Sequence, residues 1–174
     1  GTTLDLTEFW NRIFAAQQNV FHACSEDIDL IYHYSQHKTL ENVFDTQVGM
    51  SFLGHGLQVS YQNALKTMLD VDIEKDQTRS DWLARPLTPE QLMYAANDVE
   101  YIMQLSEKVK TELSEKRLLD YVLEDCCSLT YEIGQEKPIS MLYQDMGNYR
   151  NSRKQLMQLQ QLAVWREQMV KALN

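Results

Sequence analysis

Two side chains able to act on a polar bond, the phenol of Tyr94 and the carboxylate of Asp98, stand four residues apart in one helical segment. That spacing places both on the same face of a helix. The helix has a well-marked start, because Thr88 is a good N-cap, Pro89 suits the first turn and Gln91 completes a capping box. Apolar residues at helical spacing then predict one inward face, formed by Leu92, Ala95, Val99, Ile102, Val109 and Leu113. A phenol and a carboxylate at the edge of that face can point into a cleft; the alternative is a surface aspartate beside a half-buried tyrosine.

A second candidate carboxylate, Asp27, follows an apolar run at residues 19–24 that predicts a buried strand. Ser25 is placed to cap the next helix, so that Glu26 and Asp27 fall in its first turn. Acidic side chains there stabilise the positive end of a helix by ~0.3–1 kcal/mol, and composition alone favours this structural role. The alternative is a metal ligand, because open α/β sheets place their sites at the carboxyl ends of strands.

Basic residues gather in and just after the polar, irregular stretch 70–82, at Lys75, Arg79 and Arg85. One interpretation is a solvated loop. The other is a phosphate clamp beside the cleft, since a guanidinium can bind a phosphate through two parallel hydrogen bonds. The residues leave both interpretations open. Trp82, which lies between the two arginines, is expected to pack against the protein rather than to stack on a base.

The four histidines show neither HxH nor HExxH spacing, so a zinc site is not expected. His22 is the one of interest, because it leads directly into the segment that contains Asp27. We treat it as a candidate contact to nucleic acid. Asp45, in contrast, is predicted to be an interior polar residue that bonds to neighbouring backbone and not a metal ligand.

Composition bounds the class of protein. The 174 residues are 44% hydrophobic, which is enough for a real core, and their formal net charge is −9. Such acidity argues against a broad basic face for nucleic acid, but a metal-dependent nuclease also gathers carboxylates. The three cysteines form no CxxC pair, which suits a reducing compartment, so we expect a cytoplasmic protein. No apolar run approaches the length of a membrane span.

Three segments, taken in order, resemble the ribonuclease D family, the tyrosine-containing subgroup of the DEDD superfamily of 3′–5′ exoribonucleases. They are His-Ala-Cys-Ser-Glu-Asp at 22–27, Phe-Asp-Thr-Gln at 44–47 and the stretch at 76–98, which includes Arg-Ser-Asp-Trp-Leu-Ala-Arg-Pro-Leu. The likeness runs from about residue 5 to about residue 129 and is most specific at 79–98.

This resemblance implies an α/β, ribonuclease H-like exonuclease fold, here largely helical because the N-terminal strands are lacking. It implies that residues 1–130 are the C-terminal part of the exonuclease domain. Residues 131–150 would then be a linker, and residues 151–174 the first helix of an HRDC-like domain. Two helices are predicted at 42–53 and 60–69, joined through the turn Gly54-His55-Gly56.

The resemblance also implies an enzyme that trims the 3′ ends of structured RNA, such as tRNA precursors, by two-metal-ion phosphodiester hydrolysis. Asp27 and Asp98 would be two of four carboxylate ligands to Mg²⁺ or Mn²⁺. Tyr94 would orient the attacking water, because a phenol with a pKa near ~10 is a poor base at neutral pH. Lys75, Arg79, Arg85 and His22 would contact the RNA.

The family's first motif, an Asp-x-Glu on a strand, is absent from this chain. Asp5 and Glu8 do not replace it, since residues three apart do not share a strand face. Because the chain opens at Gly1 without Met, we interpret it as a piece of a longer protein whose missing N-terminal segment would complete the site. Alone, it is expected to bind metal weakly and to cleave nothing. Two alternative functions stay open: a noncatalytic helical RNA-binding or protein-interaction module, and a DNA proofreading-type exonuclease.

Overall fold

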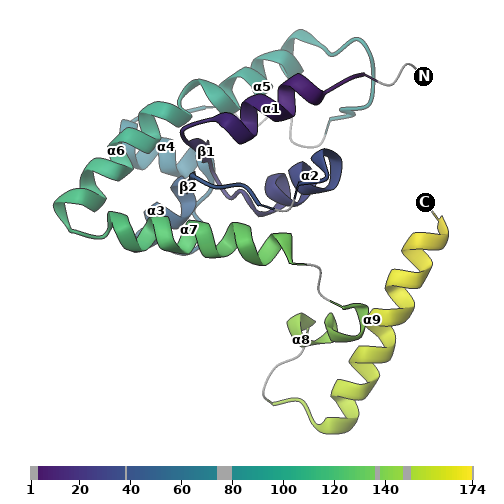
Figure 1. Cartoon of the computed structure of the whole chain (residues 1–174). Coiled ribbons are helices and arrows are strands. Elements are labelled where there is room, and N and C mark those ends of the chain that lie inside the picture. Colours follow the sequence, from purple (N-terminus) through teal and green to yellow (C-terminus); the bar gives the residue numbers. More distant parts are fainter. Residues whose placement is uncertain (1–3, 38, 74–79, 136–137, 147–149, 174) are drawn as a thin grey trace. The chain divides into compact units, whose positions relative to one another are not determined.

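The chain divides into two compact units, Gly1–Gly134 and Gln135–Asn174 (Figure 1). The computed structural model describes residues 4–37, 39–73, 80–135, 138–146 and 150–173. Lys75 and Arg79, two of the predicted contacts to RNA, lie outside these residues.

A small parallel sheet organises the first unit. Strand β1 (Asn19–Phe21) pairs with β2 (Val43–Asp45), and helix α2 (Ser25–Ser35) connects them. The strand expected at 19–24 therefore exists, although it is shorter. The helix expected across 42–53 is wrong at its start, because residues 43–45 form β2. A three-residue strand has no room to show alternation, and its pairing with β1 decides its conformation.

Helices enclose this sheet. Helix α6 (Ile102–Glu115) packs against β1, α3 (Thr46–Phe52) and α4 (Tyr61–Leu69), while α7 (Leu119–Gly134) packs against β2, α2 and α3. Close packing of α3 on α6 requires Gly49, since a Cβ there would lie 2.7 Å from Cγ1 of Val109. The two other helices described in this unit are α1 (Thr7–Ala15) and α5 (Pro89–Glu100).

The start of α5 follows the sequence prediction. The backbone N–H of Gln91 donates to Oγ1 of Thr88 at 3.2 Å, and the Thr88 N–H donates back to Oε1 of Gln91 at 2.9 Å. The buried Gln91 amide also donates to the carbonyl of Asp81 at 3.0 Å, which ties the preceding loop to the helix. The predicted capping box is confirmed.

The predicted inward face is confirmed only in its second half. Val109 and Leu113 are fully buried, but Leu92 is 56% exposed and Val99 67% exposed. The segment is also two helices rather than one, because α5 ends at Glu100 and α6 begins at Ile102. Periodicity identifies an apolar face, whereas burial depends on whether another element covers it.

The second unit is helical. A 3₁₀ turn, η1 (Ile139–Met141), and a short helix, α8 (Tyr143–Met146), pack on α9 (Arg153–Leu173). The segment expected as a linker thus contains two helical turns that belong to this unit. Among the described residues, no helix combines the length and apolar character needed to cross a membrane.

Candidate functional site

Asp27 and Asp98, which are far apart in the sequence, line one pocket of about 450 Å³ in the first unit. The pocket gathers residues from β1, the start of α2, the start of α4 and the α5–α6 region: Val20, Phe21, His22, Asp27, Tyr61, Asp98, Val99 and Ile102. The two carboxylates expected from the motifs are therefore neighbours in space.

Asp45 holds the turn that positions Asp27. One carboxylate oxygen accepts the N–H of Ala23 at 3.1 Å and the other accepts the N–H of Cys24 at 2.7 Å. Cys24, not Ser25 as predicted, is the N-cap of α2, and it makes no side-chain cap bond. The cap predicted at Ser25 is wrong, since Ser25 is already the first residue of α2, and Asp45 of β2 fixes the backbone just before it.

The same carboxylate starts α3, since Asp45 is its N-cap and accepts the N–H groups of Gln47 at 2.7 Å and Val48 at 3.4 Å. Asp45 is buried, with 1% of its surface exposed. The predicted structural role of Asp45 is confirmed: it joins the β1–α2 turn to the β2–α3 junction.

His22 is fixed by both of its ring nitrogens. Nδ1 lies 2.8 Å from Oγ1 of Thr46, and Nε2 lies 2.8 Å from the carbonyl oxygen of Val59. Burial lowers the pKa of His22, which favours a neutral ring. Nε2 donates to the carbonyl of Val59, and the Thr46 hydroxyl that meets Nδ1 also donates to the carbonyl of Phe21 at 3.0 Å. A ligand in the pocket can thus meet the ring of His22 but not its hydrogen-bonding atoms.

The protein leaves the two pocket carboxylates available to a ligand. Within the part of the chain that the structure describes, neither Asp27 nor Asp98 accepts a hydrogen bond from protein. Burial raises the pKa of Asp98. It also raises the pKa of Asp27, with further contributions from the negative charges of Glu26 and Asp45. Removing carboxylates from water without a counter-charge favours binding of a cation or a proton.

Tyr61 is a pocket residue that the sequence reasoning missed. Burial, followed by the negative charge of Asp98, raises the pKa of its phenol to about 12, so it is un-ionised at neutral pH. Its ring also lies 5.5 Å from that of His22. Its only signal in the sequence was its place at the start of the helix predicted at 60–69; in the structure it directly follows Ser60, the N-cap of α4.

The remaining predicted site residues lie outside this lining. The ring of Tyr94 is 5.8 Å from that of Trp82, and Tyr94 is one helical turn before Asp98 on α5. Arg85 folds back on its own loop, because its Nη1 donates to the carbonyls of Trp82 at 2.9 Å and Ala84 at 2.8 Å. The structure thus unites Asp27, Asp98 and His22, while Tyr94 and Arg85 are held by their local surroundings.

Carboxylate oxygens suit a hard divalent cation, but the two carboxylates of Asp27 and Asp98 are too few to complete its coordination. Mg²⁺ and Ca²⁺ sites use about six or more oxygen ligands, some of them water. Among the described residues, no group of three or more His, Cys, Asp or Glu side chains is arranged to hold a metal ion. Asp27 and Asp98 therefore fit as part of a metal site and not as a complete one.

The chain is similar in sequence to proteins of known family. Residues 3–114 match the family model described as a 3′–5′ exonuclease. The chain is 35% identical over 156 residues to ribonuclease D of Pseudomonas paraeruginosa, covering 89% of this chain and 41% of that protein. It is 33% identical over 166 residues to ribonuclease D of a Shewanella species, covering 93% of this chain and 42% of the relative.

The fold gives the same result. The crystal structure of Escherichia coli RNase D superposes with a TM-score of 0.78 at 26% identity, covering 97% of this chain and 45% of that one. The chain thus spans less than half the length of these relatives. The match of sequence and fold confirms the resemblance inferred from the motifs. The chain belongs to the 3′–5′ exonuclease family.

Proposed function

We propose that this chain carries the metal-binding carboxylates of a cytoplasmic 3′–5′ exoribonuclease that trims the ends of structured RNA such as tRNA precursors. The observation that carries the proposal is the convergence of Asp27 and Asp98 on one pocket. RNA is favoured over DNA because the matched relatives are named ribonuclease D. The related Escherichia coli protein is described as an exoribonuclease involved in structured RNA processing.

Enzymes of this family generally depend on divalent metal ions, and Asp27 and Asp98 are the side chains that would hold them here. We propose Mg²⁺ or Mn²⁺, since both prefer oxygen ligands. When bound, such ions supply Lewis acidity and an activated water for phosphodiester hydrolysis. The two further carboxylates would come from an Asp-x-Glu pair outside these 174 residues.

The other pocket residues would shape the substrate site. The apolar side chains of Val20, Val99 and Ile102 give the pocket a surface that excludes water from a bound nucleotide. Tyr94, on the same face of α5 as Asp98, is the proposed group that orients the attacking water. Arg85, together with Lys75 and Arg79, is proposed to bind phosphates, and His22 to contact RNA through its ring.

The test is Mn²⁺-dependent trimming of a 5′-labelled RNA with a structured stem and a single-stranded 3′ tail. The 174-residue chain is compared with the same chain extended by the Asp-x-Glu segment of a matched relative. We expect a ladder of 3′-shortened products from the extended chain alone. Asp98→Asn and Asp27→Asn should each reduce its rate by at least about a hundredfold. Asp29→Asn, a matched change of an exposed acid in α2, should leave it unchanged.

Two outcomes would overturn the proposal. One is trimming that persists at the wild-type rate in Asp98→Asn, and the other is cleavage that starts inside the RNA. A DNA strand of the same sequence tests the proofreading alternative, which predicts faster removal of deoxynucleotides. Binding of RNA without trimming by the extended chain would favour the noncatalytic alternative.

A further inference from the structure

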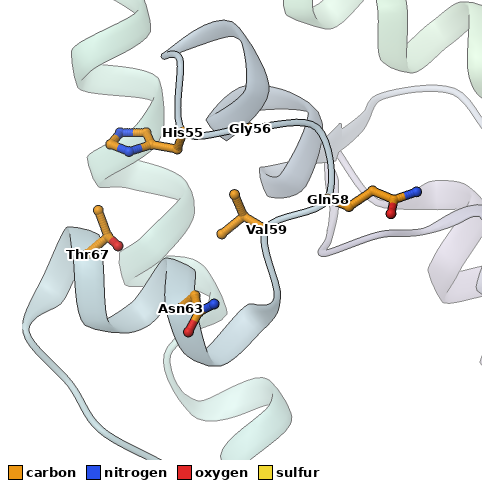
Figure 2. Close-up of a pocket in the computed structure, with 6 residues that line it drawn as sticks. All are labelled: His55, Gly56, Gln58, Val59, Asn63 and Thr67. Atoms are coloured by element: carbon orange, nitrogen blue, oxygen red, sulfur yellow. The ribbon is translucent and has the colours of Figure 1, made fainter.

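A second pocket, of about 410 Å³, opens beside the α3–α4 connection of the first unit. It is lined by His55, Gly56, Gln58, Val59, Asn63 and Thr67, none of which lines the pocket of Asp27 and Asp98. Figure 2 shows His55 on the loop, Asn63 and Thr67 on α4, and the side chain of Val59 between them. Its volume lies within the range of about 300–1,000 Å³ typical of sites for small molecules.

The lining is polar but uncharged. It offers an imidazole, carboxamides and a hydroxyl, and no Lys, Arg, Asp or Glu. Within the described part of the chain, the side chains of His55, Asn63 and Thr67 make no hydrogen bond to protein. The loop passes through Gly54 and Gly56 at φ values of +90° and +105°, and no atom lies within 4 Å of where a Cβ would stand at either. The mouth of the pocket is therefore open.

This chemistry selects a neutral, planar, hydrogen-bonding ligand. A phosphate or a metal ion would need charged partners that the lining lacks. An unpaired nucleobase fits, because proteins bind such bases by stacking on aromatic rings, histidine included, and by hydrogen bonds to their edges. Val59 supplies an apolar surface, His55 a ring, and Asn63 a carboxamide of the kind that pairs with adenine through two hydrogen bonds.

The second pocket adjoins the pocket of Asp27 and Asp98, which we call the catalytic pocket. The carbonyl of Val59 accepts from Nε2 of His22 at 2.8 Å and from Nε2 of Gln47 at 3.0 Å, while the Val59 side chain lines the second pocket. Along the same segment, Tyr61 lines the catalytic pocket and Asn63 the second pocket. Residues 59–63 thus separate two adjoining sites.

We infer that the second pocket binds an unpaired nucleobase, with adenine preferred, from the RNA strand whose 3′ end occupies the catalytic pocket. The inference rests on the proposed function for the identity of the strand. Its binding chemistry rests on the lining alone. The pocket would hold the strand upstream of its last nucleotide and so help to feed a single-stranded tail toward Asp27 and Asp98.

Binding of the base can be measured without catalysis. In NMR titrations of the 174-residue chain with adenosine, we expect the ring signals of His55 and the side-chain amide signals of Asn63 to shift. Inorganic phosphate should not move them. Asn63→Ala should weaken adenosine binding about tenfold, within the range for loss of a base contact. Asn11→Ala, which removes an exposed carboxamide from α1, should not. Unmoved signals with adenosine, or equal shifts with phosphate, would overturn the inference.

Abasic scanning then separates this inference from the nuclease assignment. One abasic nucleotide is moved stepwise from the 3′ end of a fluorescent oligoadenylate, and its affinity for the chain is read by anisotropy. We expect one position to weaken wild-type binding about tenfold and to have no such effect in Asn63→Ala. If the extended chain trims RNA but the scan is flat, the subsite is wrong and the nuclease stands. If adenosine binds at His55 and Asn63 but nothing is trimmed, the nuclease is wrong and the base site stands.

Discussion

Two neighbouring regions of the first unit treat the same chemical group in opposite ways. At the β2–α3 junction, the buried carboxylate of Asp45 accepts four backbone N–H groups, two from the β1–α2 turn and two from the first turn of α3. In the adjoining pocket, the partly desolvated carboxylates of Asp27 and Asp98 accept none within the described part of the chain. In the first arrangement the negative charge stabilises the fold. In the second it remains available to bind a ligand.

A structural acid and a functional acid differ in the hydrogen-bond donors around the carboxylate. The three side chains differ in exposure, since Asp45 is buried, Asp98 half-buried and Asp27 exposed, but exposure alone does not show why an acid is there. The distinction is whether hydrogen-bond donors compensate the desolvation. Where they do not, the carboxyl pKa rises, as at Asp27 and Asp98, and the group is suited to bind a cation.

Asp45→Ala should produce the largest effect on stability. It leaves the N–H groups of Ala23 and Cys24 without their acceptor and removes the cap of α3. We expect the free energy of unfolding to fall by about 3–5 kcal/mol, as for loss of a buried charged partner, measured by urea denaturation. Asp29→Ala, at an exposed position in α2, should change it by no more than about 0.5 kcal/mol. An equal, small loss of stability in both variants would show that the Asp45 carboxylate does not hold the fold together.

The sequence predicted those features that obey local rules. The capping box of Thr88 and Gln91 needs only four consecutive positions, and it formed as expected. The interior role of Asp45 and its bonds to neighbouring backbone, at Gln47 and Val48, were also predicted. Its bonds to Ala23 and Cys24 were not, because these residues lie more than twenty positions away in the chain. The strand at Val43–Asp45 was missed for a related reason: its pairing with β1 is a tertiary contact.

Only part of the site was predicted, because the rest of it also depends on tertiary packing. The motifs identified Asp27 and Asp98, but nothing in their spacing showed Tyr61 beside them, since α4 brings it there through packing. Tyr94 was identified by its position on the face of Asp98, yet its ring contacts Trp82 from the preceding loop. Helical periodicity places a residue on a face, and only the surrounding elements determine what that face meets.

His22 belongs to both regions. Its ring lines the pocket, while its nitrogens bind Thr46 and Val59. His22→Ala should lower the free energy of unfolding by about 2 kcal/mol, because it leaves a buried carbonyl and hydroxyl with fewer partners. His33→Ala, at an exposed position in α2, is the control and should be nearly neutral.

The contribution of His22 to the free energy of unfolding should also depend on pH. Because burial lowers its folded-state pKa, this contribution is present above the unfolded value of about 6.5 and is lost as pH falls through the folded value. The difference in stability between wild type and His22→Ala should therefore shrink on acidification. A difference that grows instead would mean that the ring is charged in the folded protein.

Asp98→Asn should show the opposite behaviour to Asp45→Ala. Its raised pKa means that the folded state holds a proton more tightly than the unfolded state, so ionisation of Asp98 opposes folding at neutral pH. In urea denaturation at pH 7, we expect Asp98→Asn to raise the free energy of unfolding, and in no case to lower it by more than about 0.5 kcal/mol. The gain should disappear below the unfolded carboxyl pKa of about 3.9, where both states are protonated. A large loss at pH 7 would show that Asp98 is a structural residue.

The smallest expected effect is a change in one pKa with almost no change in stability. After burial, the negative charge of Glu26 is the largest cause of the raised pKa of Asp27, whereas burial alone raises that of Asp98. Glu26→Gln should therefore lower the pKa of Asp27, followed by the pH dependence of its carboxyl ¹³C signal, without returning it to about 3.9.

Asp98 is the internal control for that titration, since its pKa should not move in Glu26→Gln. Raising the salt concentration to 1 M in the wild type should reproduce part of the change at Asp27, because ions screen an exposed neighbouring charge and do not restore lost hydration. If both pKa values fall together, the two carboxylates share one electrostatic environment and Glu26 acts on the whole pocket. If neither falls, desolvation alone accounts for both, and the contrast with Asp45 reduces to the presence or absence of backbone donors.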